Sequence, residues 1–507
     1  MNPPVVIRLH ADDTVVIARS SLLPGVSLGD NVVTVGRVMA GHKVAVRSHQ
    51  PGDAVRRYGQ IIGFATRPIA PGEHVHVHNI GMGDFAKDYA WGADAIPTQY
   101  FDPPATFMGI RRPDGRVATR NYIGILTSVN CSAHVADMVA DAFKKNPFTD
   151  HNPLADFPNV DGVVALTHKT GCGMTAHEPL ALLRRTLGGY ARHVNFSHVV
   201  MIGLGCEVNQ LGDLMTEQKL AGRLRAMNIQ EIGGTRKTVA AGIAFVREVL
   251  AESNQARRAP VPASALTIAL QCGGSDGYSG ISANPALGVA SDLIVRNGGA
   301  VILSETPETY GAEHLLTRRA VSRDVGEKLV GLMRWWEEYT AKQGAEMDSN
   351  PSPGNKAGGL TTILEKSLGA MAKAGSTNLV DVIGYAEAAT ARGLVFMDTP
   401  GYDPVAATGQ VAGGANLVCF TTGRGSVFGC KPAPSIKLAT NSAMYRRMEE
   451  DMDINCGTVA DGAESVQECG ARIFELMLQT ASGAPTASEK FDFGSAEFAP
   501  WVLGATM

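Results

Sequence analysis

Four hydrophobic runs in this sequence each lead directly into a cysteine. They cover residues 122–131, 162–172, 199–206 and 266–272, and they are rich in valine, isoleucine, leucine and glycine. Runs of this kind are typical of buried strands. Because ligands of open α/β sheets bind beyond the carboxyl ends of parallel strands, thiols at those positions indicate an active site and not a disulfide framework. The sequence therefore favours a metal site or a redox-sensitive catalytic site.

Length and composition indicate a large globular protein. The 507 residues correspond to about three domains. Hydrophobic residues make up 45% of the chain and charged residues 19%, which is the balance of a well-buried fold. The net charge of −4 is spread over mixed acidic and basic residues. The chain therefore lacks the basic surface that a nucleic-acid partner requires.

Two observations predict a cytoplasmic protein. Residues 1–6 lack a basic leader, and no run approaches the roughly 18 apolar residues of a membrane span. The eight cysteines, half of them in strand-end loops, fit reduced thiols in a reducing compartment. We therefore expect no membrane partner.

Residues 1–80 read as a small all-β module, because short β-rich segments alternate closely with glycine, proline and aspartate. The module ends in a run that contains His74, His76 and His78. Residues two apart in a strand share a face, so the three imidazoles are expected to project together while Val75 and Val77 face the core. Imidazole is the commonest metal ligand. The alternative is a solvated strand face with polar alternation.

The remaining sequence predicts a linker and two α/β domains. Residues 81–107 are rich in glycine and proline and have no sustained period, so they form the linker. Residues 108–258 alternate strands with helices, which predicts a parallel sheet. A boundary is expected at 259–264, and residues 259–507 form a second α/β domain with strands near 266–270, 300–303, 393–397 and 417–420. Glu305, Asp398 and Thr421 follow strands of this second sheet.

Three loops of the second domain carry polar side chains suited to an anionic, hydroxyl-rich ligand. Residues 271–285 combine glycines, hydroxyls, a carboxylate and an amide just before a helix, whose free amides would favour an anion. This loop is neither a Walker P-loop nor a GxGxxG fingerprint. Residues 350–359 present an amide and an amine, and residues 421–425 present a guanidinium suited to a carboxylate.

Several ordered motifs resemble the altronate dehydratase and galactarate dehydratase family over essentially the whole chain. The motifs are residues 111–121, His168 with Cys172, 203–207, 271–276, 282–285, 350–356 and 422–425. The N-terminal module is similar to the SAF β domain of that family, and residues 72–79 resemble the altronate branch more than the galactarate branch. The resemblance implies an iron(II)-dependent lyase that removes water from a sugar acid to give a 2-keto-3-deoxy acid. It also suggests a homodimer.

Such a reaction needs a base, an acid or Lewis acid, and groups that hold the substrate. Lys356 and His168 are the candidate bases. The alternative for Lys356 is a loop lysine in solvent, and the alternative for His168 is a histidine whose ring nitrogens are hydrogen-bonded to the backbone. The candidates for holding the carboxylate and hydroxyls of the substrate are Arg120, Asn121, Ser275, Asp276, Asn284, Asn355 and Arg424. Asparagine and arginine in turns are often helix caps or surface residues instead.

The metal ligands are less sharply indicated, because the sequence has no CxxC pair and the ligands would converge from separate loops. The candidates are Cys131, Cys172, Cys206, Glu207, Cys272, His74 and His76. A single iron(II) with open positions, with manganese(II) as a substitute, suits dehydratase chemistry. A cysteine-ligated iron–sulfur cluster is the alternative. A small buried apolar role is the competing interpretation for each cysteine, and it is the one expected for Cys419, Cys430, Cys456 and Cys469.

Two other functions remain open. The resemblance extends to sulfolactate sulfo-lyase, in which sulfite leaves in place of hydroxide, although those enzymes look split across two chains. A non-catalytic sugar-acid sensor with oxidisable cysteines is the second alternative. The sequence does not choose among altronate, galactarate and other sugar acids.

Overall fold

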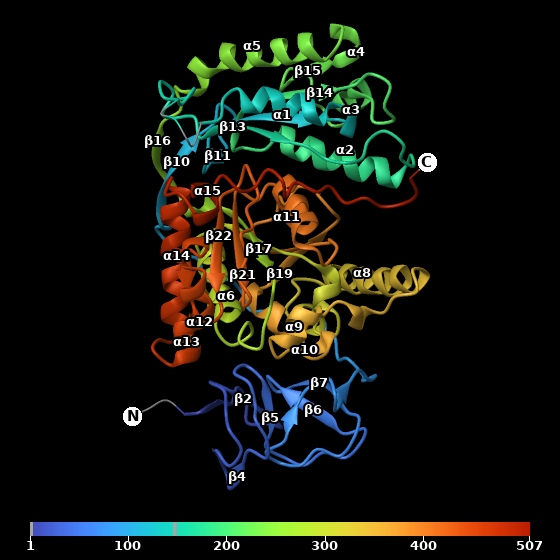
Figure 1. The fold of residues 1–507 in the computed structure, drawn as a ribbon, viewed down its shortest axis with the longest axis vertical. Helices are drawn as coiled ribbons and strands as arrows, with labels where there is room; N and C mark the ends of the chain where they lie inside the picture. Colours follow the sequence, from blue (N-terminus) through green and yellow to red (C-terminus); the bar gives the residue numbers. More distant parts are fainter. Residues whose placement is uncertain (1–3, 146–148, 150, 507) are drawn as a thin grey trace.

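The computed structural model describes residues 4–145, 149 and 151–506. Three bodies follow one another along the long axis (Figure 1). The N-terminal β domain lies at one end and the α/β domain of residues 108–258 at the other, so the C-terminal α/β domain separates them. The expected fold class is confirmed, because antiparallel β sheets precede two α/β regions with parallel sheets. None of the helices in these residues is long and apolar enough to cross a membrane.

Small antiparallel sheets build the N-terminal domain. One sheet has the order β1-β2-β5-β8, with β1 Val6–Ile7, β2 Val15–Ala18, β5 Lys43–Ala45 and β8 His74–Val75. A second pairs β6 Ala54–Arg57, β7 Gln60–Ala65 and β9 Ile80–Gly81, and a third pairs β3 Ser27–Gly29 with β4 Val32–Val33. Val16, Val38 and Val44 form part of a small core within this domain.

The histidine-rich segment differs from the expected strand. Strand β8 ends at Val75, and the chain then turns, so Val77 is 48% exposed and does not face the core. The buried side chain of Asn79 causes the turn: its Oδ1 accepts from the His76 N–H at 2.8 Å, and its Nδ2 donates to the His74 carbonyl at 2.9 Å. An asparagine that binds nearby backbone in this way competes with strand pairing.

A three-stranded antiparallel sheet connects the domains. Its order is β11-β10-β16, with β10 Thr106–Arg111, β11 Val117–Ala118 and β16 Arg258–Pro262. The boundary expected at 259–264 is therefore mostly a strand that pairs with β10. Its prolines are tolerated because β16 is an edge strand.

The central α/β domain has a parallel sheet of order β13-β12-β14-β15. The strands are β12 Tyr122–Thr127, β13 Gly162–Leu166, β14 Phe196–Gly203 and β15 Arg225–Asn228. The helices are α1 Ala133–Asp141, α2 Glu178–Ala191, α3 Leu211–Glu217, α4 Ile229–Ile232 and α5 Thr235–Ser253. Helices α1 and α5 cover one core, and α2 lies in a second core that continues into the C-terminal domain.

The C-terminal domain is built on a seven-stranded parallel sheet of order β19-β20-β18-β17-β21-β22-β23. Its strands are β17 Thr267–Cys272, β18 Ala300–Leu303, β19 Leu379–Ile383, β20 Gly393–Met397, β21 Leu417–Thr422, β22 Ser435–Ala439 and β23 Ile454–Asn455. The sequence patterns had not indicated strands β19, β22 and β23. The chain order reverses beside β17, and a reversal of this kind opens a crevice at the carboxyl ends of the strands.

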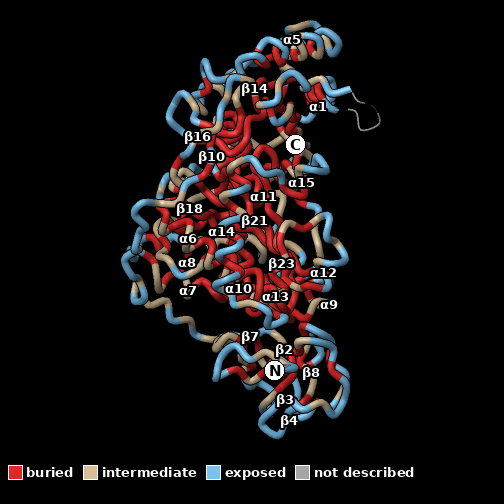
Figure 2. Tube along the Cα trace, turned by 90° about the vertical axis from the view of Figure 1, so that its left-hand side faces the viewer, coloured by how far each residue is buried: buried red, intermediate tan, exposed pale blue. Residues whose placement is uncertain are grey.

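Helices cover both faces of this sheet. They are α6 Ala283–Arg296, α7 His314–Thr317, α8 Arg323–Lys342, α9 Pro353–Ala357, α10 Ile363–Met371, α11 Asp403–Ala412, α12 Ser442–Arg447, α13 Gly457–Asp461, α14 Val466–Ala481 and α15 Ala487–Lys490. Buried backbone runs through both α/β domains, whereas much of the N-terminal domain is exposed (Figure 2). The two α/β domains share apolar core residues, among them Leu187 of α2 and Val411 of α11.

Candidate active site at the edge of the C-terminal sheet

The loop after strand β17 lies at the point where the strand order reverses. It begins at Cys272, and the two glycines that follow allow other elements to approach closely. A Cβ on Gly273 would lie 2.2 Å from Asp403 Oδ2, and a Cβ on Gly274 would lie 3.2 Å from Arg424 Cβ. Residues 272–276 are therefore flanked by the carboxylate at the start of α11 and by the arginine after β21.

Helix α9 packs against the same loop. Ser352 and Asn355 form a capping box that starts the helix. Asn355 Nδ2 donates to the Ser275 carbonyl at 2.9 Å, which holds the helix on the loop. The next residue, Lys356, is half-buried, and its ammonium group makes no hydrogen bond or ion pair within the described part of the chain. Its nitrogen is available to a ligand.

The N-terminal domain covers this edge of the sheet. Buried Glu365 of α10 accepts from Lys43 Nζ at 2.8 Å and from Arg57 at 2.6 Å, and both cations belong to the N-terminal domain. The two cations lower the pKa of Glu365 to about 2, although burial acts in the opposite direction. His42 of the same domain lies beside α9, with Nε2 3.3 Å from the Ala357 carbonyl oxygen.

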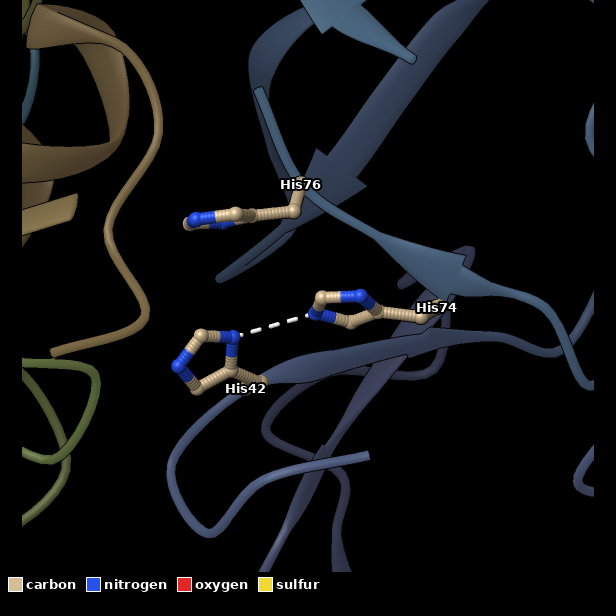
Figure 3. Close-up of side chains that lie close together, drawn as sticks. All are labelled: His42, His74 and His76. Carbon is tan, nitrogen blue, oxygen red and sulfur yellow. Dashed lines mark hydrogen bonds between the residues drawn. The ribbon is translucent and has the colours of Figure 1, made fainter. Parts of the chain in front are cut away.

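Three histidines of the N-terminal domain converge at this interface (Figure 3). One nitrogen each of His42, His74 and His76 lies within 4.8 Å of the other two. His42 Nδ1 lies 3.0 Å from His74 Nε2, and the His74 and His76 rings stack at 5.4 Å. The third member is thus His42 and not His78, which the sequence pattern had grouped with the others.

The electrostatics of this histidine cluster suit a metal ion. Burial, followed by nearby positive groups, lowers the pKa of His74 to about 4 and that of His76 to about 3. Both imidazoles are therefore neutral at pH 7, as metal ligation requires. His76 Nδ1 is buried and has no hydrogen-bond partner in the described chain. Three neutral nitrogen donors, one of them unpaired, fit a divalent transition metal.

Behind the loop lies a buried cluster of acids and lysines. Lys373 Nζ lies 2.8 Å from Cys272 Sγ and 3.9 Å from Glu305 Oε2. Lys366 Nζ donates to Glu308 at 2.6 Å and to Asn350 at 2.7 Å. Lys366 is the residue after Glu365, so α10 connects this cluster to the docked N-terminal domain.

The acids of this cluster have different affinities for protons. Burial raises the pKa of Cys272 to about 12, that of Glu305 well above its usual range and that of Asp403 to about 7. Lys366 outweighs the effect of burial on Glu308 and lowers its pKa. Glu308 balances one of the two lysines. Asp403, with a pKa of about 7, is the acid of this cluster that exchanges its proton most readily near neutral pH.

Glu305 has two further features typical of a functional residue. Its backbone is left-handed, with φ of 68°, although it is not glycine. Its Oε1 atom is buried without a hydrogen-bond partner in the described residues. Strained backbone and unpaired buried groups concentrate at functional sites. The ligand atoms of Cys272, Glu305 and Glu308 also lie within 4.8 Å of one another, but two buried ammonium groups already neutralise them. The histidine cluster is therefore the better cation site.

The expected single metal centre is not formed. Cys131, Cys172, Cys206 and Glu207 lie in loops of the central domain, Cys272 is buried in the C-terminal domain, and His74 and His76 belong to the N-terminal domain. The sequence placed the cysteines correctly at strand ends, but the first three strands and β17 belong to different sheets. Glu207 holds two loops together, because its carboxylate accepts from Ser128 Oγ and from the Gly205 N–H, both at 2.6 Å.

Two predicted residues of the central domain have their polar groups fully used elsewhere. His168 Nε2 lies 2.9 Å from the Thr127 carbonyl, and its Nδ1 accepts from the Thr170 N–H at 3.3 Å. Neither nitrogen is left for a substrate. Asn121 donates to two carbonyls and accepts from Arg112. Both side chains hold strand-end loops in place.

Two further candidates have structural contacts. Buried Arg120 forms a two-point ion pair with Glu489 and also donates to three carbonyls, so it joins the two α/β domains. A cavity of about 830 Å³ lies beside it, and the lining of that cavity includes none of residues 272–276. Asn284 donates to the Gly369 carbonyl and accepts from Thr421 Oγ1.

The remaining predicted residues lie together around the loop. Asp276 is buried and accepts from Thr440, Ser279, Asn441 and the Tyr278 N–H. Arg424 is exposed, and its guanidinium has no hydrogen-bond partner in the chain as described. Ser275 belongs to this loop, Asn355 contacts it, and Arg424 lies beside Gly274.

The sequence patterns did not indicate five residues of the site: His42, Glu308, Lys366, Lys373 and Asp403. Two weak signals were present. Glu308 follows Glu305 by three residues, and Lys373 follows Lys366 by seven, which is two helical turns. His42 begins one of the short β-rich segments of the N-terminal module, but its separation of 32 residues from His74 left no local pattern.

Comparison with known proteins gives consistent matches along the chain. Residues 4–83 match the altronate/galactarate dehydratase SAF domain. Residues 109–254 match the second domain of D-galactarate dehydratase/altronate hydrolase. Residues 263–506 match the C-terminal domain of D-galactarate/altronate dehydratase.

Three characterised relatives illustrate the similarity. The chain is 34% identical to the altronate dehydratase of Bacillus subtilis, over 99% of both chains. It is 37% identical to the L-threo-forming galactarate dehydratase of Escherichia coli, over 94% of this chain and 92% of the relative. It is also 33% identical to the beta subunit of a (2R)-sulfolactate sulfo-lyase from Chromohalobacter salexigens, over 76% of this chain and 94% of the relative.

Proposed function

The chain belongs to the altronate/galactarate dehydratase family, and from this premise we propose that it dehydrates a sugar acid such as D-altronate or galactarate. The product is a 2-keto-3-deoxy sugar acid. The observation that carries the proposal is the arrangement of Lys356 and Arg424 around loop 272–276, in a chain that matches sugar-acid dehydratases over nearly its full length. The family is one of carbon–oxygen lyases.

Arg424 and Ser275 bind the substrate in this proposal. The exposed guanidinium of Arg424 matches a carboxylate in a two-point contact. Ser275 belongs to the same glycine-rich loop, and a hydroxyl there suits a hydroxyl of the substrate.

Lys356 acts as the base. Its neutral amine removes the proton from the carbon next to the substrate carboxylate, and the electron pair moves into the carboxylate as an enediolate. The histidine cluster lies close to this lysine, because His42 Nε2 is 3.3 Å from the carbonyl oxygen of the next residue, Ala357.

Asp403 or Glu305 supplies the acid. Hydroxide leaves the neighbouring carbon and takes a proton, so that water departs and the enol becomes the keto acid. A carboxyl with a raised pKa is still protonated near neutral pH, as a general acid must be. Asp403, with its pKa raised to about 7, is the better placed of the two because it contacts loop 272–276.

His42, His74 and His76 would hold iron(II), with manganese(II) as a substitute. When bound, the ion would supply Lewis acidity that stabilises negative charge on substrate oxygens. The three residues come from one small domain, so the docking of that domain through Glu365 decides whether they reach the loop.

The test is an anaerobic assay of the purified protein with iron(II) and a panel of sugar acids together with sulfolactate. We expect 2-keto acid from altronate or galactarate and no sulfite. Release of sulfite from sulfolactate would instead support the sulfo-lyase function, to which the similarity with a sulfo-lyase subunit points. Binding of a sugar acid without turnover, in reduced and metal-loaded protein, would favour the non-catalytic sensor.

A further inference from the structure

Three exposed cysteines play no part in the proposed active site. Cys131, Cys172 and Cys206 each follow the carboxyl end of a strand of the central sheet: β12, β13 and β14. These strands are parallel neighbours, with β12 in the middle, so their loops meet at one edge of the sheet. The central sheet belongs to a different domain from loop 272–276 (Figure 1).

Hydrogen bonds join the three loops close to the cysteines. The Asn130 N–H donates to the Thr170 carbonyl, and the Asn209 N–H donates to the Gly171 carbonyl, both at 3.0 Å. Asn209 Nδ2 also donates to the Ser128 carbonyl at 3.0 Å. Each loop is therefore held to the other two, within three residues of its cysteine.

The backbone next to Cys172 is built for a close approach. Gly171 has φ of 99°, and a Cβ at this position would lie 2.3 Å from the Ser128 carbonyl oxygen. Any side chain there would push the loop of Cys172 away from the loop of Cys131. The hydrogen bond from Ser128 Oγ to Glu207 also holds the loop of Cys206 close to the loop of Cys131.

Two of the thiols have neighbours that suit a metal-bound sulfur. Cys131 lies in the turn that leads into the N-terminus of α1, where the helix dipole favours negative charge. Gln230 Nε2 donates to Cys206 Sγ at 3.4 Å, a contact of the kind that tunes metal-bound sulfur. Burial raises the pKa of Cys131, and Cys172, Cys206 and Glu207 contribute to the rise, which shows that the three sulfurs are near neighbours and that Cys131 keeps its proton until a metal ion binds.

The spacing of the sulfurs argues against a single zinc ion. Tetrahedral zinc, with bonds of about 2.3 Å to sulfur, brings its thiolates within roughly 3.8 Å of one another. In the described chain, two groups of three potential ligands have all their ligand atoms within 4.8 Å, and these thiols are not one of them. An iron–sulfur cluster spaces its thiolates further apart, because each binds a different iron.

We propose that Cys131, Cys172 and Cys206 hold a four-iron, four-sulfide cluster, in which the fourth iron has no cysteine ligand. Each thiol releases its proton to solvent as its sulfur binds one iron, and no iron changes its oxidation state in that step. The five other cysteines all belong to the C-terminal domain, and all are buried. This site is independent of the histidine cluster and of the proposed dehydration.

The test is anaerobic reconstitution of the full-length protein with equal amounts of iron(II) and iron(III) and with sulfide, which together supply the two oxidation states of the cluster. We expect about four irons and four acid-labile sulfides per chain, with the Mössbauer spectrum of a cubane cluster. The triple variant C131S/C172S/C206S should lose all of the sulfide. The control variant C430S, which changes a buried cysteine of the C-terminal domain, should keep it.

A second measurement covers the case in which the triple variant does not fold. Iodoacetamide, followed by mass spectrometry, should label Cys131, Cys172 and Cys206 in the cluster-free wild type and leave all three unlabelled after reconstitution. Equal labelling before and after would overturn the proposal, as would iron uptake without sulfide or full sulfide content in the triple variant. The variant H74Q/H76Q separates the two sites, because it should keep the cluster even if it loses dehydratase activity.

Discussion

Lys373 Nζ lies 2.8 Å from Cys272 Sγ, at the carboxyl end of the first strand of the C-terminal sheet. This contact places a cation in a fully buried position, where it needs a compensating negative charge. Glu305 lies on the other side of Lys373, and Glu308 and Lys366 complete the cluster. The charges of this buried cluster act on Asp403, whose protonation matters for the reaction proposed at the adjacent loop.

We expect Asp403→Asn to lower kcat by about 10²-fold or more and to remove the inflection near pH 7 from the pH–rate profile. The pKa of Asp403 is raised to about 7 from 3.8, so the folded protein binds this proton more tightly than the unfolded chain. The stabilising effect of that proton is complete below pH 3.8 and is lost as the pH rises to about 7. The stability of the variant minus that of the wild type should therefore be larger at pH 8 than at pH 4. Thermal melts at the two pH values measure this difference. An inflection that persists in the variant would assign the acid to another residue, and Asp381→Asn, in a half-buried position, is the control.

Lys356→Met should reduce kcat by about 10²–10⁴-fold, because the base is removed. Lys356→Arg should be almost as inactive, since a guanidinium keeps the charge but does not accept a proton. The measurement is exchange of the substrate α-hydrogen with deuterated water, which reports proton abstraction directly. Lys342→Met, which changes an exposed lysine of α8, is the matched control. Normal exchange in Lys356→Met would show that another group is the base.

Glu365→Gln should lower the free energy of unfolding by about 3–5 kcal/mol, because it leaves the buried Lys43 and Arg57 without a counter-charge. The folded-state pKa of Glu365 is about 2 against 4.5. Its stabilisation is therefore present above pH 4.5 and is lost as the pH falls through about 2. Urea unfolding should detect the change. Glu327→Gln removes an exposed ion pair with Arg323 and should cost less than about 1 kcal/mol. Equal effects of the two substitutions would contradict the docking role of Glu365.

His74→Gln and His42→Gln should each weaken manganese(II) binding by at least about tenfold, since each removes one of three nitrogen donors. The measurement is a titration followed by electron paramagnetic resonance, in protein free of iron and sulfide. His10→Gln alters an exposed histidine of the same domain and should bind manganese(II) normally. Unchanged manganese(II) affinity in both His74→Gln and His42→Gln would exclude the three histidines as the metal site.

Much of the fold could be predicted from local sequence. Strand β20 has the predicted bounds Gly393–Met397 and β18 the predicted bounds Ala300–Leu303, because buried parallel strands are continuous apolar runs between turn residues. Strand β19 was missed. Its sequence, LVDVI, contains an aspartate, which disguises a strand at the edge of the sheet.

The candidate site was only partly predictable. Lys356, Asn355 and Arg424 lie in motifs whose glycines and prolines mark functional loops, and these loops do meet around residues 272–276. Arg120 and Asn121 also lie in a motif, but their partners are Glu489 and backbone carbonyls far away in the sequence. A sequence motif shows that a polar residue has a specific partner, and it does not show whether the partner is a ligand or the protein itself.

The sequence by itself determined the alternation of the most apolar strands with helices, the placement of four cysteines at strand ends and the glycine-rich loops, because these depend on residues close together in the chain. Only the tertiary structure decided that three of those thiols lie apart from Cys272, that His42 joins His74 and His76, and that Lys366 and Lys373 balance buried acids. Which sheet a strand joins, and which charges are buried together, depend on packing between segments that are not neighbours in the chain, and local periodicity does not record that packing.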